Sequence, residues 1–308
     1  MPAADTLGAM APATSTADGL ARTVDRLVED HLGDGLSPRP VVSVWSGAVG
    51  VAAGRQALTP PAALARESTT PHYAASTMKL PLLVAAYRLH ERGGLDLDAR
   101  VEVRNRFRSS VDAPAFSLRR DDDQDDETWD RLGGRATIRE LARQAAVRSG
   151  NLAADLVHDQ VGAAEVEAVL RAAACSGRTT VGRAIGDLAA QRAGQDNLVT
   201  AVDLARVMHG VATRTLVGPS AGTELEGLLA AQQHREQIPA GLPPGTYVVD
   251  KPGWVPGVAH DIALVRPGRY GGRPPYILAV CITAPAAEPT LFGLSAAISA
   301  AVWEHWGR

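Results

Sequence analysis

The residues best suited to chemistry are Ser76 and Lys79, which are three positions apart in a segment with helical spacing. Residues three apart share one face of a helix, so the hydroxyl and the amine are expected side by side. A serine hydroxyl becomes a nucleophile when a base removes its proton, and a lysine serves as that base if burial lowers its pKa. An apolar run at residues 80–84 favours burial of Lys79. The alternative is a helix cap beside a surface lysine.

A second motif, Ser149-Gly150-Asn151, stands at the start of a predicted helix. A hydroxyl and an amide at a helix start could both face a cleft. The structural alternative is a simple helix cap, because Ser and Asn are preferred at that position.

A third motif, Lys251-Pro252-Gly253, follows a β-rich run. A lysine at the end of a strand, with glycine two residues on, could place a positive charge and a close backbone approach beside a bound acyl group. The structural alternative is an ordinary turn, since Pro and Gly punctuate turns.

The three motifs occur in the order Ser-x-x-Lys, Ser-x-Asn, Lys-x-Gly, and this combination is far more specific than any one motif. In this order the sequence resembles the class A β-lactamases and their penicillin-binding relatives, from about residue 41 to the C-terminus. Four further stretches carry the resemblance: residues 75–80 (Ala-Ser-Thr-Met-Lys-Leu), 197–200 (Asn-Leu-Val-Thr), 203–205 (Asp-Leu-Ala) and 260–263 (His-Asp-Ile-Ala).

The resemblance implies a mechanism through an acyl-enzyme. Ser76 would attack a strained or activated carbonyl, and Lys79 would act as the base. Ser149 would relay a proton to the leaving nitrogen, while Lys251 keeps the site positive. The implied enzyme is a serine hydrolase that needs no cofactor and no metal.

The resemblance also implies which residues hold the substrate. Asn151 would bind a side-chain amide, and Gly253 would allow the backbone to approach the acyl group. The backbone N–H of Ser76, with one from the late strand near Trp254 or Val255, would hold the oxyanion.

The implied substrate is a small acyl compound, namely a β-lactam or a related amide. One alternative is a related acyl hydrolase or transferase that acts on a D-alanyl peptide, an ester or a metabolite. Another is a catalytically impaired homologue that only binds a ligand. A Ser–His–Asp arrangement through His260 and Asp261 is disfavoured, because adjacent residues on a strand point to opposite faces.

The second and third motifs depart from the family pattern. Gly150 stands where the family has a structural aspartate, and Pro252 stands where it has Thr or Ser. Pro252 therefore lacks a hydroxyl that would help to bind a substrate carboxylate. The bulky Trp254 would narrow the acyl pocket or stack on a substrate.

The glutamate with which class A enzymes deacylate has no counterpart at residues 183–187. Arg183 matches the family's loop-anchoring arginine, and Asp187 is the one carboxylate close enough to substitute for the glutamate. Asp187 is therefore a candidate deacylation base, with a helix cap or a structural salt bridge as the alternative. Without a base, the acyl-enzyme would persist or pass to a nucleophile other than water.

The order of elements predicts an α/β (α+β) fold, in which both chain ends form an antiparallel sheet flanked by helices. Residues 19–70 and 212–308 are expected to form this sheet lobe, with an inserted all-helical lobe at residues 71–211 and a cleft between them. Residues 1–18 are predicted as a disordered tail and the acidic residues 119–130 as a solvated loop. Helices are predicted at residues 19–32, 74–90, 136–147, 151–161, 163–175, 204–211, 224–233 and 291–306, and strands at 40–51, 246–250, 260–265 and 276–283.

Composition sets the remaining expectations. The chain has 308 residues, 45% of them apolar and 21% charged, with a net charge of −3. This balance is typical of a soluble globular protein and gives no footprint for nucleic acid or an anionic membrane surface. We expect a monomer with free thiols at Cys175 and Cys281, rather than a disulfide or metal pair. The N-terminus lacks the features of a secretory signal, so we expect a cytoplasmic location, with a secreted protein whose leader is missing as the alternative.

Overall fold

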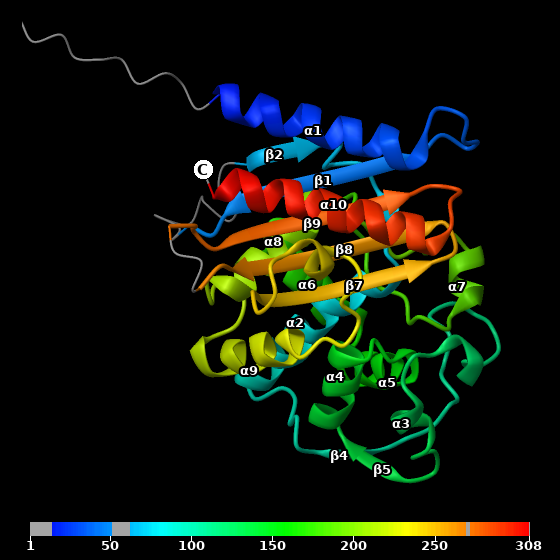
Figure 1. The fold of residues 1–308 in the computed structure, drawn as a ribbon. Coiled ribbons are helices and arrows are strands. Elements are labelled where there is room, and N and C mark those ends of the chain that lie inside the picture. The colour runs from blue at the N-terminus through cyan, green and yellow to red at the C-terminus, as the bar shows by residue number, and fades with distance from the viewer. Residues whose placement is uncertain (1–13, 51–61, 269–271, 308) are drawn as a thin grey trace, which may run out of the picture.

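The sheet at the centre of the protein is built from both ends of the chain. The computed structural model describes residues 14–50, 62–268 and 272–307. Five antiparallel strands lie in the order β2-β1-β9-β8-β7 (Figure 1). They are β1 (Val41–Ala48), β2 (Ala62–Arg66), β7 (Tyr247–Val255), β8 (Val258–Arg266) and β9 (Tyr276–Thr283). This arrangement confirms the predicted fold class.

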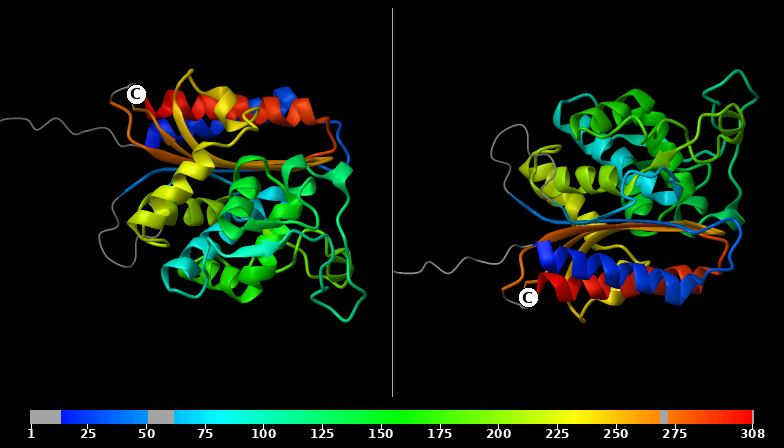
Figure 2. Two further views of the ribbon diagram at one scale, coloured as in Figure 1. Left: turned by 90° about the horizontal axis from the view of Figure 1, so that it is seen from below. Right: turned by 90° about the horizontal axis from the view of Figure 1, so that it is seen from above.

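Helices cover both faces of the sheet. Figure 2 shows α1 (Thr14–Leu32) and α10 (Glu288–Trp306) together on one face, with the other helices gathered on the opposite side. The helices of this second group are α2 (Lys79–Glu91), α3 (Asp126–Trp129), α4 (Ile138–Val147), α5 (Asn151–Val161), α6 (Ala163–Ala172), α7 (Leu188–Arg192), α8 (Ala201–Ala212) and α9 (Pro219–Ala230).

Burial on both faces explains why β9 is a continuous apolar run in the sequence. Successive side chains of a strand point to opposite faces. Leu278, Val280 and Ile282 pack in the cluster under α1 and α10, whereas Ile277 and Cys281 pack in the cluster on the helical side. The strand therefore shows no alternation of apolar and polar residues.

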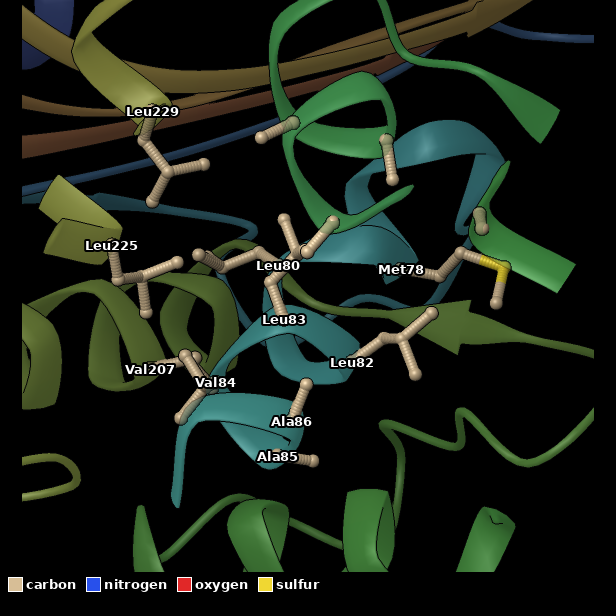
Figure 3. Close-up of a cluster of buried hydrophobic side chains, with 14 of the residues drawn as sticks. Met78, Leu80, Leu82, Leu83, Val84, Ala85, Ala86, Val207, Leu225 and Leu229 are labelled. Atoms are coloured by element: carbon tan, nitrogen blue, oxygen red, sulfur yellow. The ribbon is translucent and has the colours of Figure 1, made fainter. Parts of the chain in front are cut away.

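Helix α2 is the scaffold of the helical side. Every residue from Lys79 to Tyr87 is buried, as expected for a helix that is apolar on nearly all sides. Figure 3 shows Leu80, Leu83 and Val84 of this helix beside Val207 of α8 and the leucines of α9. The N-terminus of α2 is thereby fixed against its neighbours.

Short elements connect this scaffold to the sheet. The 3₁₀ helix η1 (Ala75–Met78) leads directly into α2 and lies against β7. Strand β3 (His72–Tyr73) pairs with β6 (Leu198–Val199), and β4 (Arg100–Glu102) pairs with β5 (Arg135–Thr137). The remaining 3₁₀ helices are η2 (Arg120–Asp122) and η3 (Ile238–Gly241).

Most predicted helices are present, with shifted ends. Helix α5 begins and ends at the predicted residues, and Thr200 caps α8, since its hydroxyl accepts a hydrogen bond from Asp203 N at 3.2 Å. Cys175 and Cys281 are free thiols, as predicted. The segment predicted as one helix over residues 74–90 starts instead as η1.

The predicted disordered tail is wrong for its last residues, because α1 begins at Thr14. Residues 1–13 lie outside the described residues. Residues 14–18 lack apolar periodicity, but they extend a helix in which Leu20 and Val24 pack in the core.

The acidic segment is not a solvated loop throughout. It forms η2 and α3, and the side chains of Asp125 and Trp129 within it are buried. A run of like charges predicts a solvated loop only when no neighbouring element offers hydrogen-bond donors. Here the backbone N–H groups at the start of α5 are such donors.

The third motif lies inside strand β7 rather than after it. Pro252 is paired with Asp261 of β8. Proline cannot donate to a strand ladder and is tolerated on edge strands, and β7 is the last strand of the sheet. The edge position was not apparent from the sequence.

The division into two lobes stays a prediction. A single apolar cluster contains Trp45, Val249 and Ile262 of the sheet together with Leu83 and Leu152 of the helical side. The sheet and the helices thus share one core.

The close approach of β7 to η1 makes a prediction about Gly253. A Cβ at this position would lie 2.6 Å from Ser76 N and 2.7 Å from Thr77 N, which are backbone atoms that cannot rotate away. We expect Gly253→Ala to lower the free energy of unfolding by about 1–3 kcal/mol, measured by urea denaturation.

The matched control is Gly227→Ala in α9, where an added Cβ meets nothing within 4 Å. Alanine favours a helix more than glycine does, so this variant should be as stable as the wild type or slightly more stable. Equal unfolding midpoints for both variants would contradict the close approach.

Candidate active site

Ser76 lies on η1, at the point where β7 passes the start of the helical side. The backbone just before it is held by a hydrogen bond from Ala74 N to Asn197 O at 2.9 Å, and Thr77 Oγ1 donates to Ala74 O at 2.6 Å. Ala75 has a φ of +44°, a left-handed backbone conformation that residues other than glycine rarely adopt. Such strain is retained where the surrounding structure fixes it, and it clusters at functional sites.

Lys79 meets Ser76 as the spacing predicted. Its amine donates to Ser76 Oγ at 2.9 Å, to Asn151 Oδ1 at 2.8 Å and to the backbone carbonyl of Ser149. The side chain is fully buried, and this burial lowers its pKa to about 8, although the carboxylates of Asp123, Asp155 and Asp125 oppose the shift. A substantial fraction of this amine is therefore neutral near physiological pH.

Lys251 reaches the same point from the sheet. Its amine donates to Ser149 Oγ at 3.0 Å and to Pro252 O at 2.8 Å. Ser149 Oγ lies 3.3 Å from the amine of Lys79, so this hydroxyl stands between the two amines. Burial, followed by the charge of Lys79, places the pKa of Lys251 well below its ordinary value.

These two amines are unusual for the chain as a whole. Lys79 and Lys251 are its only lysines, and both are fully buried at this site. All other side-chain cations, apart from histidine, are arginines. The structure thus brings together the four residues proposed for catalysis from the motifs: Ser76, Lys79, Ser149 and Lys251.

A cavity of about 120 Å³ opens beside Ser76. The residues that line it are Tyr73, Ala75, Ser76, Met78, Asp122, Gln124, Ser149, Asn151, Arg183, Ile185, Asn197, Trp254 and Val255. Three of the predicted substrate-binding residues, Asn151, Trp254 and Val255, are among them. Gly253 is not a lining residue but lies directly behind Ser76 N.

Trp254 forms an aromatic wall on the sheet side of the cavity. Its ring packs edge-on against His234, with ring centroids 4.8 Å apart, and against Phe292, at 5.9 Å. Because two rings support it, the indole is held in place, and its narrowing of an acyl pocket stays a prediction.

Asp187 is a helix cap. Its carboxylate accepts hydrogen bonds from Ser109 Oγ at 2.8 Å, Ser110 N at 2.7 Å and Ala190 N at 3.1 Å, the last at the start of α7. Burial alone would raise the pKa of this carboxyl, but the hydrogen bonds lower it below its ordinary value. Asp187 does not line the cavity, so the structure does not bring this predicted deacylation base to Ser76.

Ile185 occupies the wall that the loop at residues 183–187 presents to the cavity. Its backbone N–H donates to Asp155 at 2.6 Å, and Gly186 N donates to the same carboxylate at 3.0 Å. Arg183 anchors the loop through hydrogen bonds to backbone carbonyls, including Ile185 O at 2.9 Å. Asp122 is the one acidic residue of the lining, and its side chain is 72% exposed at the rim.

Sequence reasoning missed Asp155, which is 1% exposed and holds this loop. A carboxylate within the apolar stripe of α5, four residues after Asn151, was the signal that could have revealed it. Burial raises the pKa of Asp155 to about 6, although the two backbone hydrogen bonds act against this shift.

His260 has backbone partners at both ring nitrogens. His260 Nε2 is hydrogen-bonded to Tyr73 O at 2.9 Å, and the ring lies edge-on to His72 at 5.2 Å. Asp261 lies on the other face of β8, where its carboxylate accepts from Ile238 N at 3.1 Å. Within the described ranges, no cluster of three or more His, Cys, Asp or Glu side chains could hold a metal ion.

No helix in the described part of the chain is long and apolar enough to cross a membrane.

Comparison with known proteins gives structural relatives at low sequence identity. PBP-A is 20% identical with a TM-score of 0.72, over 97% of this chain and 98% of that one. A β-lactamase from Xanthomonas campestris pv. campestris is 19% identical with a TM-score of 0.75, over 94% and 98%. An ancestral class A β-lactamase is 21% identical with a TM-score of 0.70, over 92% and 99%. No curated protein matches the chain.

At these identities the structural relatives establish the fold alone. Membership is established by a family profile, that of the β-lactamase enzyme family named Beta-lactamase2, which matches residues 46–306. The matched range includes Ser76, Lys79, Ser149 and Lys251. This chain therefore belongs to the β-lactamase enzyme family.

Proposed function

We propose that this protein is a serine hydrolase that forms an acyl-enzyme on Ser76 with a β-lactam or a related amide. The observation that carries the proposal is the 2.9 Å hydrogen bond between Ser76 Oγ and a fully buried Lys79 amine. A hydroxyl beside a base of lowered pKa is the arrangement that nucleophilic catalysis needs.

Acylation would begin when the neutral amine of Lys79 takes the proton of the Ser76 hydroxyl. The oxygen then bonds to the substrate carbonyl carbon, and the carbonyl π electrons move onto its oxygen. The N–H groups of Ser76 and of the strand at Trp254 or Val255 would stabilise that oxyanion. As the C–N bond breaks, the Ser149 hydroxyl would give its proton to the leaving nitrogen and regain one from Lys251 or Lys79.

Deacylation of Ser76 is expected to be the slower of the two steps. It requires a base that removes a proton from water, and the two residues that line the cavity from the loop at residues 183–187, Arg183 and Ile185, include no carboxylate. We expect the acyl group to remain on Ser76 for longer than an efficient β-lactamase would allow.

This feature favours a second candidate function, transfer of the acyl group to a nucleophile other than water, with a D-alanyl peptide or an ester as the donor. Among the structural relatives, a PBP-A mutant in which a leucine is replaced by glutamate is described as an acyl-enzyme complex with penicillin G. A similar complex on Ser76 is compatible with both functions, and the lifetime of the adduct separates them.

The first prediction concerns the adduct itself. Incubation with penicillin G should add one acyl group to the protein, detected by intact-protein mass spectrometry, and Ser76→Ala should abolish the addition. Lys79→Met should slow acylation by about 10²–10⁴-fold, the usual contribution of a general base. Ser46→Ala is a buried control outside the site and should acylate normally. Failure of the wild type to react with any β-lactam or activated ester would leave only the ligand-binding alternative.

The second prediction concerns pH. Because burial lowers the pKa of Lys79 to about 8, the amine gains base character as pH rises toward that value. The acylation rate should increase about tenfold per pH unit below the midpoint and level off above it. Stopped-flow measurement with a chromogenic β-lactam between pH 5.5 and 9.5 tests this. A rate independent of pH over that range is incompatible with Lys79 as the base.

The third prediction concerns Ile185. A glutamate side chain at this position would enter the cavity and could activate water beside the acyl group. We expect Ile185→Glu to shorten the life of the adduct by about 10²-fold or more, the lower end of a general-base contribution. Ile185→Gln has nearly the same shape without the charge and should leave the lifetime unchanged. Identical lifetimes for both variants would show that the Ile185 wall does not limit deacylation.

A further inference from the structure

The turn that carries Ser149 and Asn151 lacks its own helix cap. Gly150 is the N-cap residue of α5 and has no side chain with which to accept hydrogen bonds from the first turn. The N–H groups at a helix start need partners from outside the helix. Ser149 has a φ of +60°, so the turn also holds a conformation that is costly for serine.

Asp123 supplies the missing partner from a distant part of the chain. Its carboxylate accepts hydrogen bonds from Asn151 N at 2.7 Å and from Leu152 N at 2.8 Å. It is itself held by Trp129 Nε1 at 2.8 Å and Gln124 N at 2.8 Å. A carboxylate at a helix start is also favoured by the positive end of the helix dipole.

Asp125 fills the space that a side chain at residue 150 would occupy. A Cβ on Gly150 would lie 2.8 Å from Asp125 Cβ and 2.9 Å from Asp125 Oδ2. Asp125 is fully buried, accepts from Glu127 N at 3.2 Å and also accepts from the Thr128 hydroxyl. Gly150 and Asp125 are therefore a matched pair: a carboxylate at one position requires the absence of a side chain at the other.

The same segment orients the amide of Asn151. The backbone carbonyl of Asp122 accepts from Asn151 Nδ2 at 2.8 Å, which turns Asn151 Oδ1 toward the Lys79 amine, 2.8 Å away. A continuous set of hydrogen bonds thus leads from residues 122–123 through Asn151 to Lys79 and Ser76.

We infer that Asp123 is a positioning residue for the acylation step, which places Asn151 and Lys79 through the start of α5, and that Asp125 takes over the space left by Gly150. The inference rests on the proposed function for its role in acylation. Its geometric part, the external cap of the motif that bears Ser149, holds for the folded protein whether or not the protein is acylated.

The charge of Asp123 gives its positioning role a measurable effect, on the pKa of Lys79, that simple loss of structure would not produce. The charged groups that face Lys79 are Asp123 and Asp125 from the acidic segment, Asp155 from α5, Lys251 from β7 and His234 from the loop before η3. The carboxylates raise the pKa of Lys79, and Asp123 has the largest effect among them. Removing its charge should therefore lower the pKa of Lys79.

The test is Asp123→Asn, with Asp121→Asn as the matched control. Asp121 belongs to the same segment, but its side chain is 87% exposed. Because the chain has only two lysines, a protein labelled with ¹³Cε-lysine gives two resonances, and Lys79→Met assigns them. We expect Asp123→Asn to move the titration midpoint of Lys79 to lower pH by about half a unit or more. Asp121→Asn should leave it unchanged.

Acylation kinetics provide the second readout. In Asp123→Asn the midpoint of the pH–rate profile should move down together with the NMR midpoint. The plateau rate should fall, because one amide oxygen replaces a carboxylate that serves two helix N–H groups. A folded variant with an unchanged midpoint and plateau would overturn the positioning role. If the wild type forms no adduct, the proposed function fails, and the NMR titration still decides the inference.

A pair of variants at residues 150 and 125 tests whether Asp125 takes over the space left by Gly150. This test remains available if Asp123→Asn does not fold. Gly150→Asp alone should lower the unfolding midpoint and the acylation rate, because its side chain collides with Asp125. Gly150→Asp combined with Asp125→Gly should recover most of both losses. A Gly150→Asp protein with wild-type stability and rate, or a double variant that is no better than Gly150→Asp, would overturn the pairing.

Discussion

Two amines buried without an ion-pair partner are the constraint on which the structure of the site depends. Lys79 and Lys251 have no solvent exposure, and within the described residues neither forms an ion pair. Moving an ammonium out of water costs several kcal/mol unless hydrogen-bond acceptors surround it. Ser76, Ser149, Asn151 and Pro252 supply those acceptors. Each of the three motifs contributes an oxygen to one of these two amines.

The carboxylates of the sheet that could offset the charge of Lys251 do not contact its amine. Residues 249, 251 and 253 of β7 face the helices, whereas Asp250 and, on β8, Asp261 face the layer of α1 and α10. Burial raises the pKa of both carboxyls, that of Asp261 to about 7, so they carry less negative charge than exposed carboxylates would. They act on Lys251 through the strand without contacting it. The amine is thus stabilised in place while its pKa stays low.

The sequence predicted the parts of this arrangement that depend on local pattern. The apolar run after Lys79 indicated its burial, and the limits of α5 were predicted to the residue. The family resemblance implied that Ser149 and Lys251 would share a site with Ser76. Contacts across long separations were not accessible in this way. The cap that Asp123 provides to α5 links residues 28 positions apart, and within the sequence it was hidden in a run of like charges. Pro252 in a strand makes sense only once β7 is known to be an edge.

The fate of Asp187 illustrates the same limit. Its place in the loop at residues 183–187 made it a candidate, but two serines nearly eighty residues earlier in the chain supply donors that bind its carboxylate. The apolar wall that remains has an electrostatic consequence. A carboxylate in the cavity close to Lys79 would favour the ammonium form, since an opposite charge nearby raises a lysine pKa. With Ile185 at that wall, the carboxylates that act on Lys79 are set back behind Asn151 and α5. The same substitution of an apolar side chain for an acid therefore favours the neutral base that acylation needs and removes the group that would activate water. In the proposed reaction, acylation and hydrolysis would make opposing demands on this one position, and an apolar side chain there would suit the first.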